Sequence, residues 1–234
     1  MLMEGALIVH AVREPTRAIA IEDYCMYTLY YSPGTASLVV HLALLEIGAP
    51  HRLECVDFSA NAQKDPEYLK LNPQGRVPTL IVDGKPVFES AALLMLLAER
   101  HPEARLAPAV GTPERAAWYQ WIVYMANTLM PAYRLWFYPP DASGEAEHPA
   151  NVRAIIQARI EGAFDLLDKH LAANGPYMLG EFSGVDLLLT MLMRWSRNMP
   201  KPATEWSALK KLADLVRARA SWKKLYEIEG LTEW

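Results

Sequence analysis

The sequence predicts a small α/β domain over residues 26–101 and an all-helical domain over residues 113–234. Short segments rich in β-branched and aromatic residues alternate with helical patterns in the first part, whereas every pattern after residue 112 is helical. The stretch between them is rich in proline, which is typical of a linker, and we place that linker at residues 102–112. A chain of 234 residues, 52% of them hydrophobic, is long enough to bury two such cores.

The first domain opens with a strand, a helix and a second strand. Residues 28–32 favour a strand, and Pro33-Gly34 supplies the turn that follows. A stripe of leucines at every third or fourth position then predicts a helix that ends at Gly48. Residues 51–58 return as a strand, and because a helix separates the two strands, we expect them to pair in parallel.

The second half of this domain contains a hairpin. Asp83-Gly84 is a strong two-residue turn signal between two β-rich segments, and Ser90 is expected to cap the helix that follows. The predicted elements are a helix at 66–71, strands at 79–82 and 85–88, and a helix at 91–100. The resulting order, β-α-β-α-β-β-α, is that of a thioredoxin-like domain.

The second domain reads as a bundle of helices. Trp118 and Trp121 lie on the apolar face of its first helix and are expected to be core, because aromatic stripes at helical spacing usually are. Ser183 and Asp186 form a capping box, with an acid that serves the fold. Helices are expected to begin at Pro113, to span 151–171, to begin after Ser183, and to span about 206–219 and 221–228, with a polar loop at 141–148.

Composition excludes several classes of function. A net charge of −4 and scattered basic residues offer no broad attraction for nucleic acid or acidic membranes. The longest apolar stretch, residues 185–193, is about half of what a membrane-spanning helix needs. Two cysteines, Cys25 and Cys55, show neither a disulfide framework nor a metal-ligand spacing, which favours a reduced, cytoplasmic setting and no metal.

Residues 1–25 could suggest a targeting signal. Glu4, His10, Arg13 and Glu14 interrupt any apolar run, and the acids argue against a transit peptide. We expect a poorly ordered extension that contributes little to the fold.

A proline stands at the mouth of a predicted central strand, in the step Val77-Pro78. Proline removes a backbone donor from the sheet, so this position suggests a cis peptide bond that turns the chain. The Val77 N–H and C=O would then be left free to pair with an extended peptide. A trans proline in a loop is the alternative, and the hairpin that follows favours the cis form.

Glu89-Ser90 lies where a predicted strand passes into a helix. The free N–H groups and the positive dipole end of that helix can bind a carboxylate, with help from the Ser90 hydroxyl, while Glu89 can accept from an ammonium group. Together they match the head group of an amino acid, such as a γ-glutamyl moiety. The plainer alternative is an ordinary helix cap.

Five motifs together resemble bacterial cytosolic glutathione S-transferases, closest to the beta class, and the resemblance covers residues 26–234. The motifs are Tyr30-Tyr-Ser-Pro-Gly-Thr-Ala-Ser37, Asn72-Pro-Gln-Gly-Arg-Val-Pro-Thr79, Phe88-Glu-Ser-Ala91, Leu179-Gly-Glu-Phe-Ser-Gly-Val-Asp186 and Ala218-Arg-Ala-Ser-Trp222. The resemblance implies a thioredoxin-like domain joined to a helical bundle, a homodimer, and glutathione as co-substrate. It also implies that Val77, in the step with Pro78, pairs with the cysteinyl backbone. Glu89 and Ser90 would then hold the γ-glutamyl group, and Gln63 or Lys64 would reach the glycyl carboxylate.

One position departs from the beta class, which has a cysteine where this chain has Ala36. Disulfide exchange through that position is therefore excluded. A hydroxyl donor and the N-terminus of the first helix can instead stabilise a thiolate. Ser32, Thr35 and Ser37 are the candidate catalytic hydroxyls, and their spacing leaves open which of them faces the sulfur.

Aromatic and polar residues gather where the first helix of the bundle continues toward Pro131. Tyr124, Asn127, Tyr133 and Trp136 are expected to form the pocket for the electrophile, as this region does in related proteins. The sequence shows no partner for His41 or His101, and we assign them no catalytic role.

The leading hypothesis is a glutathione transferase that conjugates glutathione to a small hydrophobic electrophile. Another glutathione-dependent reaction remains an alternative, whether isomerisation, dehalogenation, ether cleavage or peroxide reduction, because such enzymes differ in the pocket rather than in the peptide site. A non-catalytic glutathione-binding or regulatory protein is the third.

Overall fold

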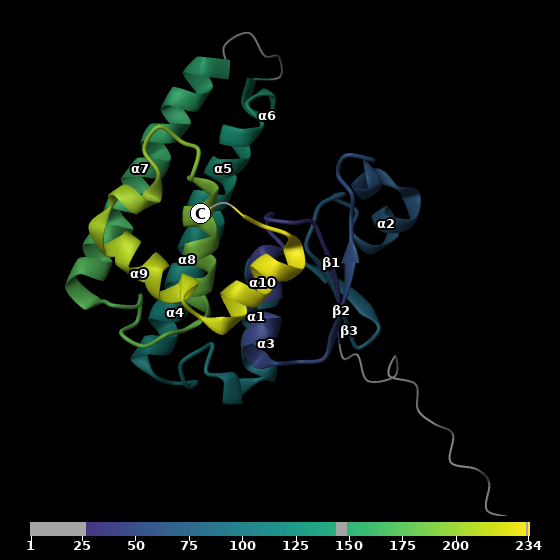
Figure 1. Ribbon diagram of the computed structural model, residues 1–234, viewed down its shortest axis with the longest axis horizontal. Coiled ribbons are helices and arrows are strands. Elements are labelled where there is room, and N and C mark those ends of the chain that lie inside the picture. The colour runs from purple at the N-terminus through teal and green to yellow at the C-terminus, as the bar shows by residue number, and fades with distance from the viewer. Residues whose placement is uncertain (1–26, 144–148, 233) are drawn as a thin grey trace, which may run out of the picture.

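The computed structural model describes residues 27–143, 149–232 and 234 of the chain (Figure 1). The extension expected at residues 1–25 lies outside the described residues. A small sheet with its helices forms one side of the molecule, and a bundle of longer helices forms the other. Within the described residues, no helix is long and apolar enough to cross a membrane.

The sheet contains β1 (Tyr27–Tyr31), β2 (His51–Cys55), β3 (Thr79–Val82) and β4 (Lys85–Phe88). Its strand order is β2-β1-β3-β4. Strand β1 pairs in parallel with β2, with Tyr27 opposite His51, and antiparallel with β3. Asp83 and Gly84 both have positive φ at the turn between β3 and β4, as the two-residue turn signal predicts. The thioredoxin-like order of elements is confirmed.

Strand β2 is shorter than the predicted segment 51–58. Val56 N–H still donates to the Tyr31 carbonyl at 2.7 Å, but Asp57 Oδ1 then accepts from Ser59 N–H at 2.8 Å. This local hydrogen bond turns the chain away from the sheet, as short polar side chains often do.

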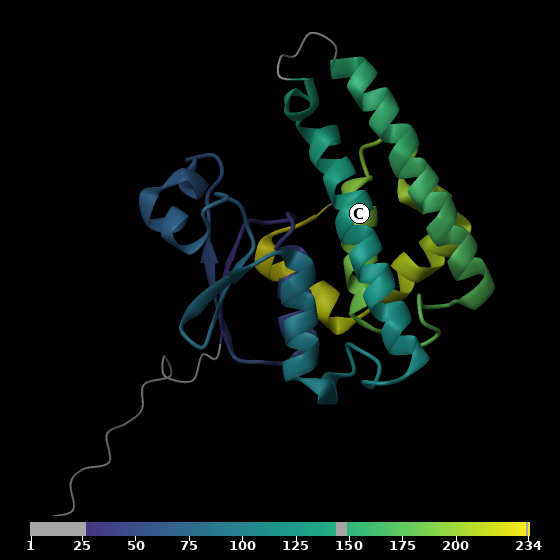
Figure 2. The ribbon, with the colours of Figure 1, turned by 180° about the vertical axis from the view of Figure 1, so that it is seen from behind.

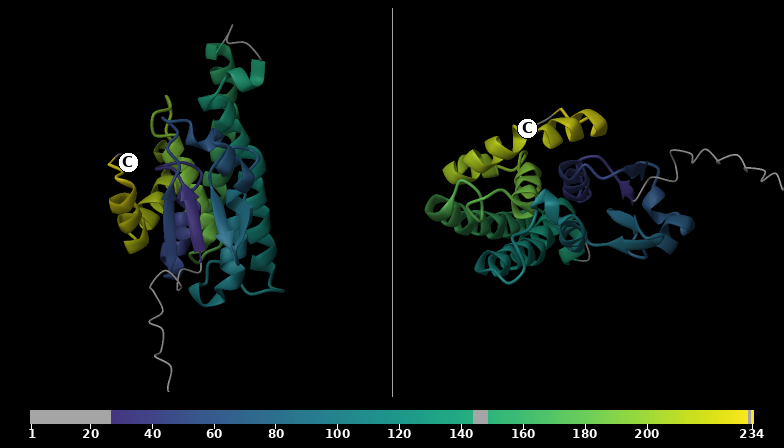
Figure 3. Two further views of the ribbon diagram at one scale, coloured as in Figure 1. Left: turned by 90° about the vertical axis from the view of Figure 1, so that its right-hand side faces the viewer. Right: turned by 90° about the horizontal axis from the view of Figure 1, so that it is seen from below.

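The helices of this domain lie on both sides of the sheet. They are α1 (Leu38–Ile47), a short 3₁₀ turn (Ala62–Lys64), α2 (Pro66–Leu71) and α3 (Ser90–Arg100). Helices α1 and α3 pack between the sheet and the bundle, whereas α2 lies on the far side (Figures 1 and 3). The face of the sheet that carries α1 and α3 therefore looks toward the second domain.

The sequence predicts Ser90 as the cap of α3. In the structure Ser90 is instead the first residue of that helix. Glu89 occupies the cap position with a φ of 78°. The Ser90 hydroxyl donates to the carbonyl of Ala36 at 2.8 Å, which takes it away from the N–H groups of its own helix.

The second domain is all helical. Its main helices are α4 (Pro113–Tyr124), α5 (Met130–Phe137), α6 (Pro140–Ser143), α7 (Pro149–Asn174), α8 (Gly184–Trp195), α9 (Ser207–Arg217) and α10 (Ala220–Glu229). A π-helical turn, Met125–Leu129, joins α4 to α5, and single 3₁₀ turns lie at Pro102–Ala104 and Ala203–Glu205. Helices α5 and α7 run side by side (Figure 2). The predicted loop at 141–148 begins as helix, and residues 144–148 lie outside the described part.

Helix α8 is the centre of the molecule. All of its residues from Gly184 to Arg194 are buried, and it contacts α1, α3, α4 and α9. The capping box is present, with Asp186 Oδ2 accepting from Ser183 N–H at 2.7 Å and Oδ1 accepting from Met178 N–H at 2.9 Å. Burial raises the pKa of the Asp186 carboxyl to about 6.

One continuous hydrophobic core joins the two domains. Leu29 and Leu80 of the sheet belong to the same buried cluster as Leu188 of α8. Trp118 and Trp121 are core residues of the bundle, as predicted, with 0% and 6% of their surface exposed. The position of the sheet relative to the bundle is thus fixed by shared packing rather than by the linker alone.

Candidate active site

A pocket of about 1100 Å³ lies between the α/β domain and helices α5 and α8. Ligand pockets for one small molecule have volumes of roughly 300 to 1000 Å³, so this pocket has room for a peptide and a second molecule. The predicted site residues that line it are Thr35, Gln63, Lys64, Val77, Pro78, Glu89, Ser90 and Tyr133. The predicted residues that do not line it are Ser32, Ser37, Tyr124, Asn127 and Trp136.

The Val77-Pro78 peptide bond is cis, as the sequence predicts. The loop before it is held in place, because the Arg76 carbonyl accepts from the Tyr68 hydroxyl at 2.6 Å and from the Asn72 side-chain amide at 2.9 Å. The N–H and C=O of Val77 make no hydrogen bond within the part of the chain that the structure describes. A fixed backbone edge with a free donor and a free acceptor can pair with an extended peptide.

Glu89 and Ser90 border the same pocket at the N-terminus of α3. Glu89 is exposed, and its Oε1 accepts from the Gln74 amide at 3.2 Å. Its left-handed backbone is unusual for a residue other than glycine, and such conformations occur often at functional sites. Ser90 is buried, and its backbone N–H lies at the positive end of the helix dipole. The pair therefore presents an acceptor for an ammonium group and donors for a carboxylate.

Two of the three candidate hydroxyls, those of Thr35 and Ser37, meet at the Ser32 carbonyl. Thr35 Oγ1 donates to it at 2.7 Å, and Ser37 Oγ donates to it at 3.1 Å. The two hydroxyl oxygens lie 3.0 Å apart. Thr35 is half-buried and faces the pocket, whereas Ser32 and Ser37 are buried behind it. Of the three, Thr35 is the hydroxyl that a bound thiol could reach.

A backbone donor lies beside Thr35. Ala36 lines the pocket, and its N–H has no acceptor among the described residues. It precedes Ser37, the N-cap of α1, so the dipole of that helix adds positive potential at the same place. A thiolate at this point would meet a hydroxyl, an N–H group and a helix N-terminus.

Glu229 and Trp195, both distant in sequence, hold the loop through the backbone N–H and carbonyl of Gly34. Its N–H donates to Glu229 Oε2 of α10 at 2.8 Å, and its carbonyl accepts from Trp195 Nε1 of α8 at 3.2 Å. Glu229 Oε1 is in turn 2.8 Å from His41 Nδ1, and both side chains are fully buried. The sequence shows no partner for His41, because the partner comes from the other domain.

His101 also has partners that the sequence does not show. Its Nε2 lies 2.9 Å from the Tyr27 hydroxyl, and its Nδ1 lies 3.2 Å from Glu103 Oε1. These contacts join the end of α3 to β1, away from the pocket lining.

The wall on the bundle side differs from the one predicted. Tyr133 lines the pocket, together with Phe137, Tyr138 and Trp195, of which the last comes from α8. Rings of this wall pack closely, with 5.5 Å between the centroids of Tyr133 and Trp195. The Tyr133 hydroxyl is buried without a hydrogen bond, and burial raises its pKa. A buried neutral phenol of this kind supports packing rather than acid-base chemistry.

Tyr124, Asn127 and Trp136 were placed in the pocket by sequence, and the structure corrects this. Tyr124 packs edge-on against Trp121, with ring centroids 5.8 Å apart, and Asn127 is exposed. Trp136 is half-buried against the core. The π-helical turn before α5 inserts an extra residue and rotates the face that carries Trp136. Tyr124 precedes this turn, and its place is set by the packing on Trp121 in its own helix.

Among the described residues, no three His, Cys, Asp or Glu side chains gather in a group that could hold a metal ion. Cys55 is exposed and free, and Cys25 lies outside the described residues.

Comparison with known proteins links this site to one family. Residues 26–99 match the family model described as glutathione S-transferase, N-terminal domain. Glutathione S-transferase GST-4.5 of Xanthomonas campestris pv. campestris is 28% identical over 87% of this chain and 98% of its own. The maleylacetoacetate isomerase of Dictyostelium discoideum is 31% identical over 70% of this chain and 75% of its own.

Solved structures of similar fold include bacterial enzymes. A glutathione transferase homologue from Sulfitobacter, with bound glutathione, has 28% identity and a TM-score of 0.81 over 88% of this chain and 99% of its own. A beta-class glutathione S-transferase of Sphingomonas chungbukensis has 26% identity and a TM-score of 0.77 over 88% of this chain and 100% of its own. The resemblance to bacterial and beta-class proteins, read from the motifs, is confirmed.

Proposed function

We propose that this chain, which belongs to the glutathione S-transferase family, binds glutathione between its two domains and transfers the glutathione thiolate to a hydrophobic electrophile. The observation that carries the proposal is the arrangement of one pocket. The side of the pocket that the α/β domain forms contains the free backbone edge of Val77, the N-terminus of α3 and Thr35. The opposite wall is aromatic, as a hydrophobic second substrate requires.

Each part of glutathione has a partner of matching chemistry. The α-carboxylate of the γ-glutamyl group binds at Ser90 and the start of α3, and its ammonium group binds Glu89. The cysteinyl backbone pairs with Val77. Lys64 meets the glycyl carboxylate, and Gln63, whose Oε1 is buried without a partner, accepts an N–H of the peptide.

Thr35 and the Ala36 N–H stabilise the thiolate. In the present geometry Thr35 Oγ1 donates to the Ser32 carbonyl. A rotation about its side chain turns the proton toward sulfur, and Ser37, 3.0 Å away, can then donate to Thr35 Oγ1. Donors aimed at an anion lower the pKa of the bound thiol. The thiolate attacks the electrophilic carbon, a C–S bond forms, and the leaving group departs with its bonding electron pair.

Calorimetry and a conjugation assay test the two halves of the proposal. Ser90→Ala is expected to weaken glutathione binding about tenfold, because it removes the hydroxyl that would turn from the Ala36 carbonyl to donate to the charged carboxylate. Thr35→Val, which keeps the shape of the side chain, is expected to lower kcat about tenfold, as the loss of one of several donors would. Ser207→Ala and Thr204→Val, both outside the pocket, are the matched controls.

The outcomes separate the competing functions. Conjugation of 1-chloro-2,4-dinitrobenzene that is lowered by Thr35→Val supports the transferase. Binding of glutathione with no turnover of any electrophile would instead support a non-catalytic binding protein. An absence of binding at millimolar glutathione would contradict the proposal as a whole.

A homodimer in a reducing, cytoplasmic setting completes the proposal. It follows from family membership, and sedimentation equilibrium tests it directly by the mass of the particle. A monomer at micromolar concentration would contradict it.

A further inference from the structure

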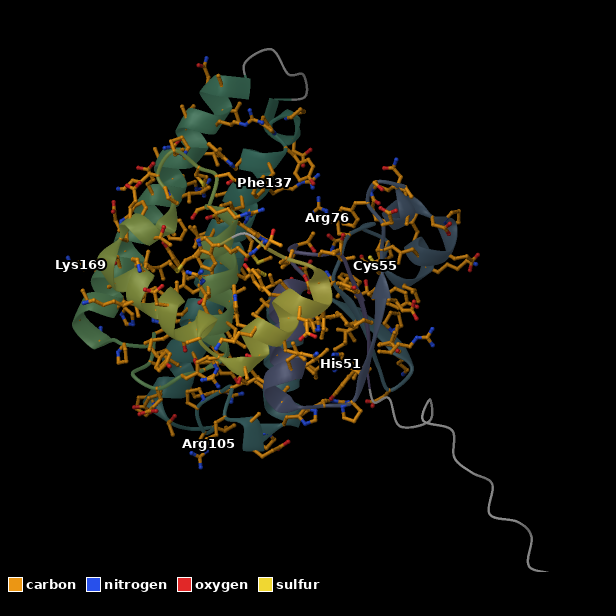
Figure 4. All side chains as sticks on the ribbon, in the orientation of Figure 1. His51, Cys55, Arg76, Arg105, Phe137 and Lys169 are labelled. Carbon is orange, nitrogen blue, oxygen red and sulfur yellow. The ribbon has the colours of Figure 1, made fainter. Side chains whose placement is uncertain are left out.

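Arg76 is a positively charged residue of the pocket that takes no part in the contacts proposed for glutathione. Its side chain is exposed, and it forms no hydrogen bond or ion pair with the residues that the structure describes. Figure 4 shows Arg76 at the gap between the two domains, with Phe137 of α5 on the facing side. What Arg76 does bears on the choice of electrophile, so this inference rests on the proposed function.

The backbone of Arg76 is rigid, although its side chain is free. The hydroxyl of Tyr68 and the amide of Asn72 both donate to its carbonyl, at 2.6 and 2.9 Å. Tyr68 and Asn72 are themselves buried. The guanidinium therefore extends into the pocket lining from a fixed point one residue before Val77.

The other arginines of the pocket are already engaged. Arg134 Nε donates to Asp141 Oδ2 at 2.5 Å, and its guanidinium lies over the ring of Tyr138, 3.9 Å from the centroid. Arg197 donates to the carbonyl of Arg194 at 3.2 Å. With Lys64 assigned to the glycyl carboxylate, Arg76 is the remaining positive charge available to a second substrate.

The wall opposite Arg76 suits a flat ring. Phe137 and Tyr138 are large aromatic side chains with 47% and 48% of their surface exposed, which leaves much apolar area open to a ligand. The rings of Tyr133 and Phe137 are stacked, with an interplanar angle of 19°. A planar aromatic molecule can extend this stack.

We propose that Arg76 and the aromatic wall together select aryl electrophiles that carry a carboxylate. The ring packs on Phe137 and Tyr138, and the carboxylate pairs with the guanidinium, whose planar fork can bind both oxygens. The pairing holds the reacting carbon near the thiolate. The charge of the guanidinium also reduces the electrostatic repulsion between the substrate carboxylate and the glutathione thiolate.

A matched pair of substrates tests this. The aryl chlorides 4-chloro-3-nitrobenzoate and 4-chloro-3-nitrobenzamide have the same shape, and only the first is charged. The quantity measured is the ratio of kcat/KM for the acid to that for the amide. Arg76→Gln should lower this ratio about fivefold, as the loss of an exposed charge pair would. Arg76→Glu should lower it further, and Arg76→Lys should restore part of it.

Lys169→Gln is the control, because Lys169 is an exposed cation on the far side of the bundle (Figure 4). It should leave the ratio unchanged. Added KCl should reduce the acid's advantage in the wild type, since salt screens an exposed pair. A ratio that Arg76→Gln leaves unchanged would overturn the inference. So would an equal loss for both substrates with a raised KM for glutathione, which would assign Arg76 to the glycyl carboxylate.

Binding of an unreactive pair keeps the test independent of turnover. In calorimetry on the glutathione-loaded protein, 3-nitrobenzoate should bind more tightly than 3-nitrobenzamide, and Arg76→Gln should remove the difference. If neither aryl chloride reacts but this preference is present, the proposed transfer fails while the inference stands. Equal binding of the two ligands contradicts the inference whatever the turnover.

Discussion

Glu229, the last residue of α10, accepts a hydrogen bond from the backbone N–H of Gly34 at 2.8 Å, across 195 positions of sequence. Its second oxygen lies 2.8 Å from His41 Nδ1 in α1. Both oxygens of one buried carboxylate are thus used to fix the loop that carries Thr35. The C-terminal helix acts on the proposed site through this loop, because Glu229 does not line the pocket.

Replacing Glu229 by alanine should weaken both stability and turnover. The substitution leaves a buried histidine and a backbone N–H without their acceptor, which costs about 2 to 3 kcal/mol of unfolding free energy. Glu229→Gln keeps an acceptor for Gly34 and should retain most of kcat. Glu227→Ala, on the same helix with an exposed ion pair to Lys224, is the control. Urea unfolding and kcat measure the two effects, and equal behaviour of Glu227→Ala and Glu229→Ala would contradict this role.

Gly34, in the first loop, and Gly48, at the end of α1, allow the effect of crowding to be measured apart from the effect of backbone strain. Gly34 and Gly48 have φ of 69° and 71°, so a side chain is strained at either position. A Cβ at Gly34 would lie 2.9 Å from Arg194 Nη1, whereas a Cβ at Gly48 meets nothing within 4 Å. Gly48→Ala should cost about 1 kcal/mol. Gly34→Ala should cost more and should also lower kcat, and equal losses of stability in the two variants would show that Arg194 gives way freely.

Asp186 gives the fold a distinctive pH dependence. Its pKa is raised to about 6 from a model-compound value of 3.8, so the folded protein binds more protons than the unfolded chain between these values. Its contribution to stability is therefore present at low pH and is lost as the pH rises through 6. Asp186→Asn has no carboxyl to protonate, so the stability advantage of the wild type over the variant should be about 2 kcal/mol larger at pH 4.5 than at pH 7. Urea unfolding at both pH values measures it, and an advantage that is larger at pH 7 would reverse the sign.

The fold followed from the sequence where the signals are local. The hairpin at 79–82 and 85–88 and the helix at 66–71 lie where the turn, cap and proline signals place them, because each signal acts within a few residues. The cis bond at Val77-Pro78 and the position of Ser90 at a helix start also follow from local signals. These local features also form the part of the pocket that we propose binds the peptide.

The rest of the site depends on contacts that local patterns cannot contain. Trp195 and Glu229 reach Gly34 from 161 and 195 positions away, and no spacing rule joins them. Among the three hydroxyls, only the folded loop shows that Thr35 faces the pocket while Ser32 and Ser37 lie behind it. The aromatic wall was misplaced for a different reason. The expectation for Trp136 assumed that the first helix of the bundle continues unbroken toward it, and the π-helical turn at Met125–Leu129 interrupts that regular spacing.

The pKa of the bound thiol tests the central claim most directly. Ultraviolet titration of glutathione bound to the wild type should show a thiol pKa at least one unit below that of free glutathione, because Thr35, the Ala36 N–H and the N-terminus of α1 all favour the anion. Thr35→Val should move that pKa back toward the free value, with the Thr204→Val control unchanged. A bound thiol that titrates as it does in free solution, or one whose lowered pKa is indifferent to Thr35→Val, would contradict the account.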